Sequence, residues 1–358
     1  METRYAFCIF SWLCVMWPSL LTGKVTWDPS TLTLVAEGGT YARIIRLQSG
    51  DLLCCYQRSR QSRVKRSTDN GATWGRETTV TNYHHGTGAN PELIQLQNGE
   101  IWLLFNERPN DENYPYAISR HISKDDGKTW GKAERLFTAG KDKRTGCWEP
   151  VALQYPDGET QIFFANELPY KDSDEQEISM ISSLERDKVH TVAMRANARD
   201  GMPVPVLLAN GEVVIAIEDS DIDGKMKPVI LRSDLKHRWR EGVISGNSPR
   251  RERALTNPLP TEVYAGAPYI CQLPNGATVL SVQSDEDRDE PRMVVYTGDS
   301  LARNFRAKSV PFPTDDDAGG YWSSLFAKGR DTVSAVSATT INGVRGIWTI
   351  DGIVPKAR

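Results

Sequence analysis

Four acidic residues in this sequence stand beside apolar segments and are candidates for acid–base chemistry. They are Glu149 in CWEPVALQ, Glu167 in FFANE, Glu218 in AIED and Asp285 in SVQSDE. Hydrolysis of a glycosidic bond needs two carboxyl groups, one to protonate the leaving oxygen and one to act as nucleophile or base. Burial and a neighbouring like charge raise the pKa of one such group, so that it keeps its proton near neutral pH. These residue types therefore suit glycoside hydrolysis if the fold brings them together.

Four further side chains, at the starts of apolar segments, are of types that bind sugars. They are Arg43, Asn90, Trp148 and Tyr321. Of the four acidic residues, we expect Glu149 and Glu218 to be catalytic and Glu167 and Asp285 to bind substrate. Trp148 adjoins Glu149, so its ring could desolvate that carboxyl group or stack on a sugar. For Arg43 the alternative is a salt bridge inside the protein, and for Tyr321 it is a place in the core.

The elements that must position these residues form an internal repeat. Six segments each contain an apolar run, a turn centred on a glycine and a second apolar run. The turn glycines are Gly50, Gly99, Gly158, Gly211, Gly276 and Gly329. Turns such as N-G and D-G between β-rich runs predict hairpins. Most hairpins are followed by a third apolar run, so each unit has room for about four strands, the size of a propeller blade. We therefore predict an all-β fold, a six-bladed β-propeller, with a β-sandwich or two smaller β domains as the alternative.

The two ends of the chain predict how the propeller closes. The last unit ends at residues 346–351 without residues for a fourth strand, and residues 31–37 (TLTLVAE) precede the first hairpin as a free strand. We expect this N-terminal strand to join the last blade, because that pairing removes the open edge between the first and last units.

Hairpin geometry predicts that the candidate residues meet at one end of the propeller. The first strand of each unit starts near the central axis at one face and runs to the glycine turn at the opposite face, where the second strand returns. Residues before the first strand and after the second therefore surround one central funnel. In this arrangement Glu149 of the third unit and Glu218 of the fourth face each other across a small gap.

Two segments, 67–75 (STDNGATWG) and 123–131 (SKDDGKTWG), share the pattern S-x-D-[DN]-G-x-T-W-G. The pattern resembles the Asp-box of sialidases and their relatives, which are six-bladed propellers. The motif is specific for the fold and weak for chemistry. The resemblance implies that Asp69, Trp74, Asp125 and Trp130 stabilise outer turns and have a structural role.

Other segments resemble the exo-acting α-L-arabinanases of glycoside hydrolase family 93. The resemblance covers residues 31–353 and is carried by CWEPVALQ, FFANE, GMPVPVLL with AIED, GAPYICQLPNG, YWSSLF and GIWTIDG. It implies a retaining mechanism with two glutamates, whose positions Glu149 and Glu218 match. We assign Glu149 as the acid/base and Glu218 as the nucleophile, and the sequence leaves the reverse assignment open. Glu167 competes for an acid or supporting role. Tyr321 resembles the catalytic tyrosine of sialidases in position, and Arg43 matches the first of their three arginines, although this chain has YARI in place of FRIP.

The substrate that the resemblance implies is α-1,5-L-arabinan, with release of arabinobiose. Units four and five begin with GMPVP and GAPYI, which have proline where a sialidase has arginine. A sialic acid carboxylate is bound by an arginine cluster, so these prolines favour a neutral sugar. Arg195, Arg199 and Arg288 lie in neighbouring loops and could substitute. An exo-sialidase and a non-catalytic glycan-binding propeller are the alternative functions.

Composition and the N-terminus indicate where the protein acts. A formal net charge of −3 gives no reason to expect a nucleic-acid partner. Arg4 and an apolar run over residues 6–21 are typical of a secretory signal, with cleavage near Gly23. An uncleaved anchor is the alternative, although the run is short for a membrane span. We expect a signal peptide over residues 1–23 and one catalytic propeller over residues 24–358. We further expect a secreted, extracellular monomer that binds an oligosaccharide or polysaccharide and has no membrane contact after cleavage.

Cysteine usage gives no support for a disulfide scaffold or a metal site. The four cysteines outside the N-terminal segment are Cys54, Cys55, Cys147 and Cys271, too few to staple a chain of this length. No C-x-x-C or H-E-x-x-H motif occurs, so we expect buried thiols and neither cofactor nor metal.

Overall fold

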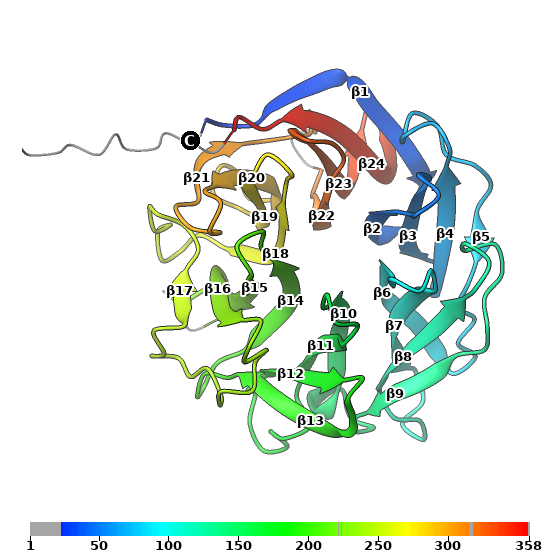
Figure 1. Ribbon diagram of the computed structural model, residues 1–358, viewed down its shortest axis with the longest axis vertical. Helices are drawn as coiled ribbons and strands as arrows, with labels where there is room; N and C mark the ends of the chain where they lie inside the picture. Colours follow the sequence, from blue (N-terminus) through cyan, green and yellow to red (C-terminus); the bar gives the residue numbers. More distant parts are fainter. Residues whose placement is uncertain (1–22, 221, 223, 315–317, 357–358) are drawn as a thin grey trace, which may run out of the picture.

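Six antiparallel sheets of four strands surround a central axis in the computed structural model (Figure 1). The structure describes residues 23–220, 222, 224–314 and 318–356, so residues 1–22 of the expected signal peptide lie outside the described part of the chain. The prediction of an all-β, six-bladed propeller is confirmed. Among the described residues, no helix is long and apolar enough to cross a membrane.

Each blade contains four strands, counted here from the axis outward. Blade 1 contains β2 (Thr40–Arg46), β3 (Leu52–Arg58), β4 (Gln61–Ser67) and β5 (Thr78–Thr79), and blade 2 contains β6 (Gly86–Gln95), β7 (Ile101–Pro109), β8 (Ala117–Ser123) and β9 (Glu134–Thr138). Blade 3 contains β10 (Cys147–Gln154), β11 (Thr160–Asn166), β12 (Glu177–Ser182) and β13 (Glu185–Ala193), and blade 4 contains β14 (Asp200–Leu207), β15 (Glu212–Asp219), β16 (Lys227–Asp234) and β17 (Arg251–Arg253). Blade 5 contains β18 (Ala265–Gln272), β19 (Thr278–Ser284), β20 (Arg292–Gly298) and β21 (Arg306–Ser309), and blade 6 contains β22 (Tyr321–Ala327), β23 (Thr332–Ile341), β24 (Val344–Ile353) and β1 (Thr26–Glu37). A short 3-10 helix, η1 (Lys143–Thr145), lies between β9 and β10.

The N-terminal strand is the outer strand of the last blade. Strand β1 pairs antiparallel with β24, from Thr26 opposite Ile353 to Glu37 opposite Gly346. The first and last strands of the chain therefore lie side by side in one sheet (Figure 1).

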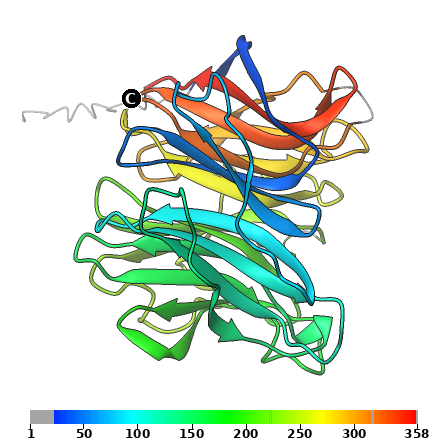
Figure 2. The ribbon, with the colours of Figure 1, turned by 90° about the vertical axis from the view of Figure 1, so that its right-hand side faces the viewer.

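The core consists of apolar layers between neighbouring blades, which pack face to face (Figure 2). Between blades 3 and 4, for example, Phe163 of β11 and Ile215 of β15 belong to one buried cluster. A strand covered on both faces needs a continuous apolar run, as β15 has in VVIAI, and not an alternating pattern. Cys54 and Cys55, successive residues of β3, lie in clusters on opposite sides of blade 1, as the alternation of strand side chains requires. Both are free thiols, and so are Cys147 and Cys271.

Each innermost strand carries a β-bulge at the same place, near the end of the axis where the strand starts. The first bulged residue of each has a positive φ, a conformation that strains a residue other than glycine by roughly 1–3 kcal/mol. These six residues are Tyr41 (φ 55°), Asn90 (47°), Glu149 (56°), Met202 (51°), Ala267 (47°) and Trp322 (48°). In blades 2 to 5 the next residue is proline, which lacks the N–H that an unbroken ladder would need. The bulges therefore form a ring of six equivalent positions around the axis, and we call them the bulge ring.

Three members of the bulge ring close the axis. Tyr41, Met202 and Ala267 pack into one cluster and are each 5% exposed or less. Two residues further along β2, Arg43 forms a buried ion pair with Glu92 of β6, with 3.2 Å between Nε and Oε2. The Arg43 guanidinium also lies 3.9 Å from the centre of the Tyr41 ring. The Tyr41 ring and the buried Arg43–Glu92 ion pair thus fill the axis. A ligand on the axis would bind on the side of Tyr41 that faces away from this ion pair.

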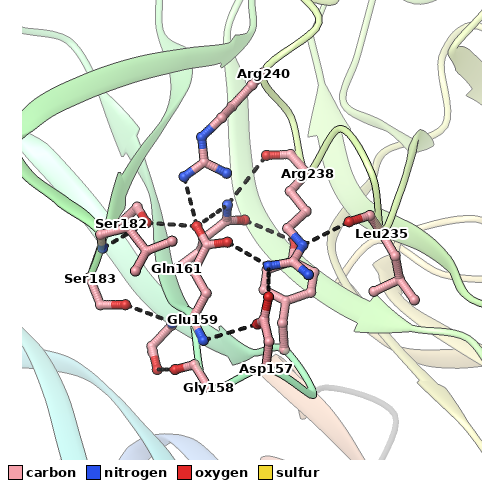
Figure 3. Close-up of polar contacts among 12 residues, drawn as sticks. Asp157, Gly158, Glu159, Gln161, Ser182, Ser183, Leu235, Arg238 and Arg240 are labelled. Atoms are coloured by element: carbon pink, nitrogen blue, oxygen red, sulfur yellow. Dashed lines mark hydrogen bonds and ion pairs between the residues drawn. The ribbon is translucent and has the colours of Figure 1, made fainter.

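A buried carboxylate joins blades 3 and 4 at the opposite face. Glu159 lies between the Gly158 turn and β11, and its side chain is 2% exposed. It accepts hydrogen bonds from Arg238 and Arg240 of the β16–β17 connection, at 2.8 and 2.7 Å, and from Ser182 at 2.7 Å (Figure 3). Burial alone would raise the pKa of Glu159, but these donors outweigh burial and lower it to about 2.

We predict that Glu159→Gln destabilises the protein by roughly 3 kcal/mol, because it leaves two arginines partly buried without their shared carboxylate. Asp157→Asn is the matched control, since Asp157 bonds the same Arg238 at 2.7 Å but is 56% exposed. It should cost less than about 1 kcal/mol. Urea unfolding measures both values, and equal losses would contradict the assignment.

The same measurement has a defined pH dependence. A carboxyl group whose pKa is lower in the folded state stabilises the fold above its unfolded pKa and loses that effect as the pH falls. The advantage of the wild type over Glu159→Gln should therefore be complete above pH 4.5 and shrink as the pH falls towards about 2.

Candidate active site

Glu149 is the one carboxylate of the bulge ring. Its Oε2 accepts a hydrogen bond of 3.2 Å from the backbone N–H of Met202, the bulge-ring residue of blade 4. Burial raises the pKa of Glu149, while the positive charge of Arg108 opposes that rise. The bulge thus turns a carboxyl group towards the axis and holds it in a poorly solvated place.

Glu218 lies near the end of β15, opposite Gly201 of β14. Its Oε2 accepts a hydrogen bond of 2.6 Å from the N–H of Ala267, the bulge-ring residue of blade 5. Burial, the larger cause, and the negative charge of Glu149 together raise the pKa of Glu218 to about 7. Glu218 therefore titrates in the range where a catalytic carboxyl group changes its charge.

The two glutamates meet on either side of the segment Gly201–Met202. Glu149 bonds the N–H of Met202, and a Cβ atom built on Gly201 would lie 3.0 Å from Oε1 of Glu218. The absence of a side chain at Gly201 therefore leaves room for the Glu218 carboxylate. The sequence-based prediction that Glu149 and Glu218 lie across a small gap agrees with this placement. Two interacting carboxyl groups titrate as a pair, so the apparent pKa values belong to the pair and not to either residue alone.

The repeat provides an internal comparison for Glu218. Gln57 and Gln283 occupy the same place in blades 1 and 5, each opposite the residue before the bulge. Gln57 Oε1 accepts from Asn90 N at 3.4 Å, and Gln283 Oε1 accepts from Trp322 N at 2.9 Å. A glutamine is therefore sufficient for the structural bond to the next blade. The hydrogen bond between blades does not require the ionisable proton that a carboxyl group at position 218 has.

Arg108 connects Glu149 with two other predicted residues. It donates to Asn90 Oδ1 and, at 2.8 Å, to Asn106 Oδ1, and its guanidinium lies 4.9 Å from the centre of the Trp148 ring. Burial lowers the pKa of Arg108, and the charge of Glu149 counteracts this effect. Asn90 and Trp148 therefore adjoin the carboxylate pair, as predicted, through an arginine that was not among the predicted binding residues.

Glu167 is a third acidic residue near the carboxylate pair. It is 5% exposed and forms an ion pair with Arg199, which also donates to Gln176 Oε1 at 2.7 Å. The negative charge of Glu167 contributes to the raised pKa of Glu149. Glu167 is therefore held in a salt bridge close to Glu149.

Three predicted residues have other contacts. Arg43 is 1% exposed beneath Tyr41 and is paired with Glu92, the alternative that the sequence left open. Asp285 accepts from the backbone N–H of Tyr264 at 2.6 Å. The Tyr321 hydroxyl donates to Glu290 at 2.6 Å, so it is not engaged with either glutamate of the pair.

Two aromatic residues that the sequence did not single out lie at the same end of the axis as the pair. Trp322 is the bulge-ring residue of blade 6 and is 42% exposed, whereas Tyr41 is buried. Tyr264 precedes β18 and approaches Glu218 over Gly266. The bulges themselves have a sequence signal, since N-P, E-P, M-P and A-P occur at the same place in blades 2 to 5. Aligning the six units on those dipeptides finds Trp322, but nothing in the pattern finds Tyr264.

The repeated turns lie at the other end of the blades. Asp69 Oδ1 accepts from Thr73 N at 2.9 Å and from Ser67 Oγ at 2.8 Å, and Asp125 makes the corresponding bonds within its own turn. Trp74 and Trp130 pack against the clusters on the two sides of blade 1. Each of these side chains is thus engaged within its own turn or against the core.

Solved structures of several glycosidases share this fold. An α-L-arabinanase from Penicillium chrysogenum, complexed with arabinobiose, has a TM-score of 0.68 at 20% identity, over 94% of this chain and 99% of that one. The GH93 α-L-arabinofuranosidase of Fusarium graminearum, also with arabinobiose, has a TM-score of 0.67 at 20% identity, over 94% and 96%. The chain has the sialidase-like propeller fold. The NanB sialidase from Streptococcus pneumoniae matches with a TM-score of 0.57 at 12% identity, over 90% of this chain and 70% of that one. No protein-family model and no curated protein sequence matches the chain.

We predict that Gly266→Ala disturbs the site. A Cβ atom at this position would lie 2.3 Å from Tyr264 Oη and 2.7 Å from Glu218 Oε2, so both side chains must move. We expect a loss of about 1–3 kcal/mol in the free energy of unfolding, as for overpacking elsewhere. Gly75→Ala is the control, because its nearest atom would be 3.4 Å away. Urea unfolding compares the two variants, and equal stabilities would show that the site accommodates the methyl group.

Proposed function

We propose that this protein is an exo-acting glycoside hydrolase that cleaves α-1,5-L-arabinan with retention of configuration. The observation that carries the proposal is the pair of partly buried carboxyl groups, Glu149 and Glu218, on either side of Gly201–Met202. One proton shared by two carboxyl groups is the state in which an acid and a nucleophile are present together.

In the proposed mechanism the reacting form has its proton on Glu149 and has Glu218 ionised, although the charge of Glu149 in the free protein favours the proton on Glu218. Glu149 gives its proton to the glycosidic oxygen while a Glu218 oxygen attacks the anomeric carbon, so the C–O bond to the leaving group breaks as the glycosyl–enzyme ester forms. Glu149, now ionised, then takes a proton from water, whose oxygen attacks the anomeric carbon and releases Glu218. The Ala267 N–H bonds Oε2 of Glu218, which leaves Oε1, on the Gly201 side, for the attack.

A neutral sugar is supported by the engagement of the arginines. Arg43 is buried with Glu92, and Arg199 is paired with Glu167. Arg195 donates to Asp219 at 2.9 Å, and Arg288 donates to the backbone at Glu290 and Ala318. A sialic acid carboxylate needs free bidentate donors, and these four arginines are bound to protein groups. That two neighbours of this fold were solved with arabinobiose supports a pentose oligomer.

Aromatic and polar surfaces near the pair can receive the sugar chain. Trp322 offers an exposed indole ring of the kind that stacks on sugars. A cavity of about 510 Å³ lined by Tyr116 and Lys141 adjoins the Trp148 side, since the Tyr116 and Trp148 rings lie 5.0 Å apart. Another of about 330 Å³ includes Arg199. The substrate chain would extend from the pair towards one of these cavities.

The decisive experiment compares substrates and glutamine variants. We expect arabinobiose release from linear arabinan and no hydrolysis of 4-methylumbelliferyl sialate. Glu149→Gln and Glu218→Gln should each reduce kcat/KM by about 10²–10⁴-fold, the usual worth of an acid–base group. Glu218→Gln should fold normally, because Gln57 and Gln283 make the same structural bond in other blades.

The outcomes separate the three candidate functions. Sialidase activity alone would exclude the arabinanase, and glycan binding without hydrolysis would favour a non-catalytic propeller. Folded glutamine variants with full activity would refute the assignment of the pair. Proton NMR of the first-formed product distinguishes retention from inversion.

We also propose that the protein acts outside the cell as a monomer. The extracellular location is supported by the apolar run of residues 6–21 behind Arg4. N-terminal sequencing of protein recovered from the medium, together with its hydrodynamic size, tests both points.

A further inference from the structure

Tyr264 approaches the carboxylate of Glu218 across a glycine. A Cβ atom on Gly266 would lie 2.3 Å from Tyr264 Oη and 2.7 Å from Glu218 Oε2. The two oxygens are therefore no more than 5.0 Å apart (2.3 Å plus 2.7 Å), and a side chain at Gly266 would occupy the space beside both of them. Tyr264 belongs to blade 5 and Glu218 to blade 4, so the approach spans two blades.

The surroundings of Tyr264 orient its hydroxyl group. Gln283 Nε2 donates to Tyr264 Oη at 3.2 Å, which occupies a lone pair of the phenol oxygen and leaves its hydrogen to donate. Gln283 is itself fixed, because its Oε1 accepts from the N–H of Trp322 at 2.9 Å. The backbone of Tyr264 is fixed by Asp285, whose Oδ1 accepts from Tyr264 N.

We propose that Tyr264 is a positioning residue that donates its phenolic hydrogen to the carboxylate of Glu218 and holds it ionised for attack. This inference rests on the proposed function, in which Glu218 is the nucleophile. It also gives Asp285 and Gln283 a purpose at the site, since both hold Tyr264 in place and neither needs to contact substrate.

The charges around Glu218 explain why such a donor is needed. Glu149 of β10 faces Glu218 and raises its pKa, and burial acts in the same direction. Arg199, which precedes β14, lowers that pKa, but its guanidinium is engaged with Glu167 and Gln176. The Ala267 N–H is the other stabilising group. A tyrosine hydroxyl is a neutral donor, so it stabilises the Glu218 carboxylate without a positive charge. A positive charge would also lower the pKa of Glu149 and so favour loss of its proton.

Tyr264→Phe tests the inference directly. The variant keeps the ring and removes the donor, so the pKa of Glu218 should rise by roughly half to one unit, the worth of one hydrogen bond. Carbon-13 NMR of protein labelled at the glutamate carboxyl carbons measures this pKa, and Glu218→Gln identifies the resonance. Tyr296→Phe is the control, because it removes a tyrosine that bonds a different carboxylate, Glu286, in the same blade.

The enzyme assay supplies a second readout. If Glu218 must be ionised, kcat/KM falls as the pH drops below its pKa, and a higher pKa moves this acid limb to higher pH. We expect Tyr264→Phe to shift the acid limb by the same half to one unit as the NMR titration and to lower kcat by roughly 10-fold, with KM little changed.

An unchanged Glu218 titration in folded Tyr264→Phe would overturn the inference, and so would an equal shift in Tyr296→Phe. A wild type that hydrolyses no glycoside would overturn the proposed function instead. In that case the NMR titration still decides whether Tyr264 stabilises the Glu218 carboxylate.

Discussion

The bulge in each innermost strand is the constraint on which the site depends. Positive φ at the bulge redirects one side chain per blade and takes the backbone N–H of the bulged residue out of the regular ladder. At four of the six positions a side chain of the preceding blade accepts from that N–H: Gln57, Glu149, Glu218 and Gln283. The strain of the bulges is tolerated because blade packing and these bonds hold the strands in place.

Both candidate catalytic groups are therefore also parts of the architecture. Glu149 and Glu218 each close a junction between blades, and in two other junctions a glutamine does the same. Acid–base catalysis at this site requires a carboxylate, in place of a glutamine amide, as the acceptor of the N–H bond between blades. Glu149 and Glu218 provide it at two neighbouring junctions at the same end of the axis. The same bonds fix the carboxylates in position before any ligand arrives, which is the preorganisation that a catalytic pair requires.

Much of the fold follows from local features of the chain. Apolar runs around glycine turns specify hairpins, and continuous apolar strands such as β15 require cover on both faces, which stacked blades provide. Strand geometry also placed Glu149 and Glu218 at one end of the axis, since each lies at a predictable end of an inner strand. Arg43 and Tyr321 lie at equivalent ends, yet Arg43 is sealed below Tyr41 and Tyr321 turns to Glu290. The position of a residue along a strand therefore does not predict the direction in which its side chain points near a bulge.

The sequence by itself determined the repeat, the number of blades and the end of the propeller where carboxylates gather, because these follow from short-range periodicity and turn chemistry. Only the tertiary structure decided which side chains meet there. The approach of Tyr264 to Glu218 over Gly266, the contact of Arg108 with Asn90 and Trp148, and the closure of the axis by Tyr41 all join different blades or depend on a bulge. Such contacts are set by how sheets pack on one another, and a one-residue change in register at a bulge is enough to redirect them.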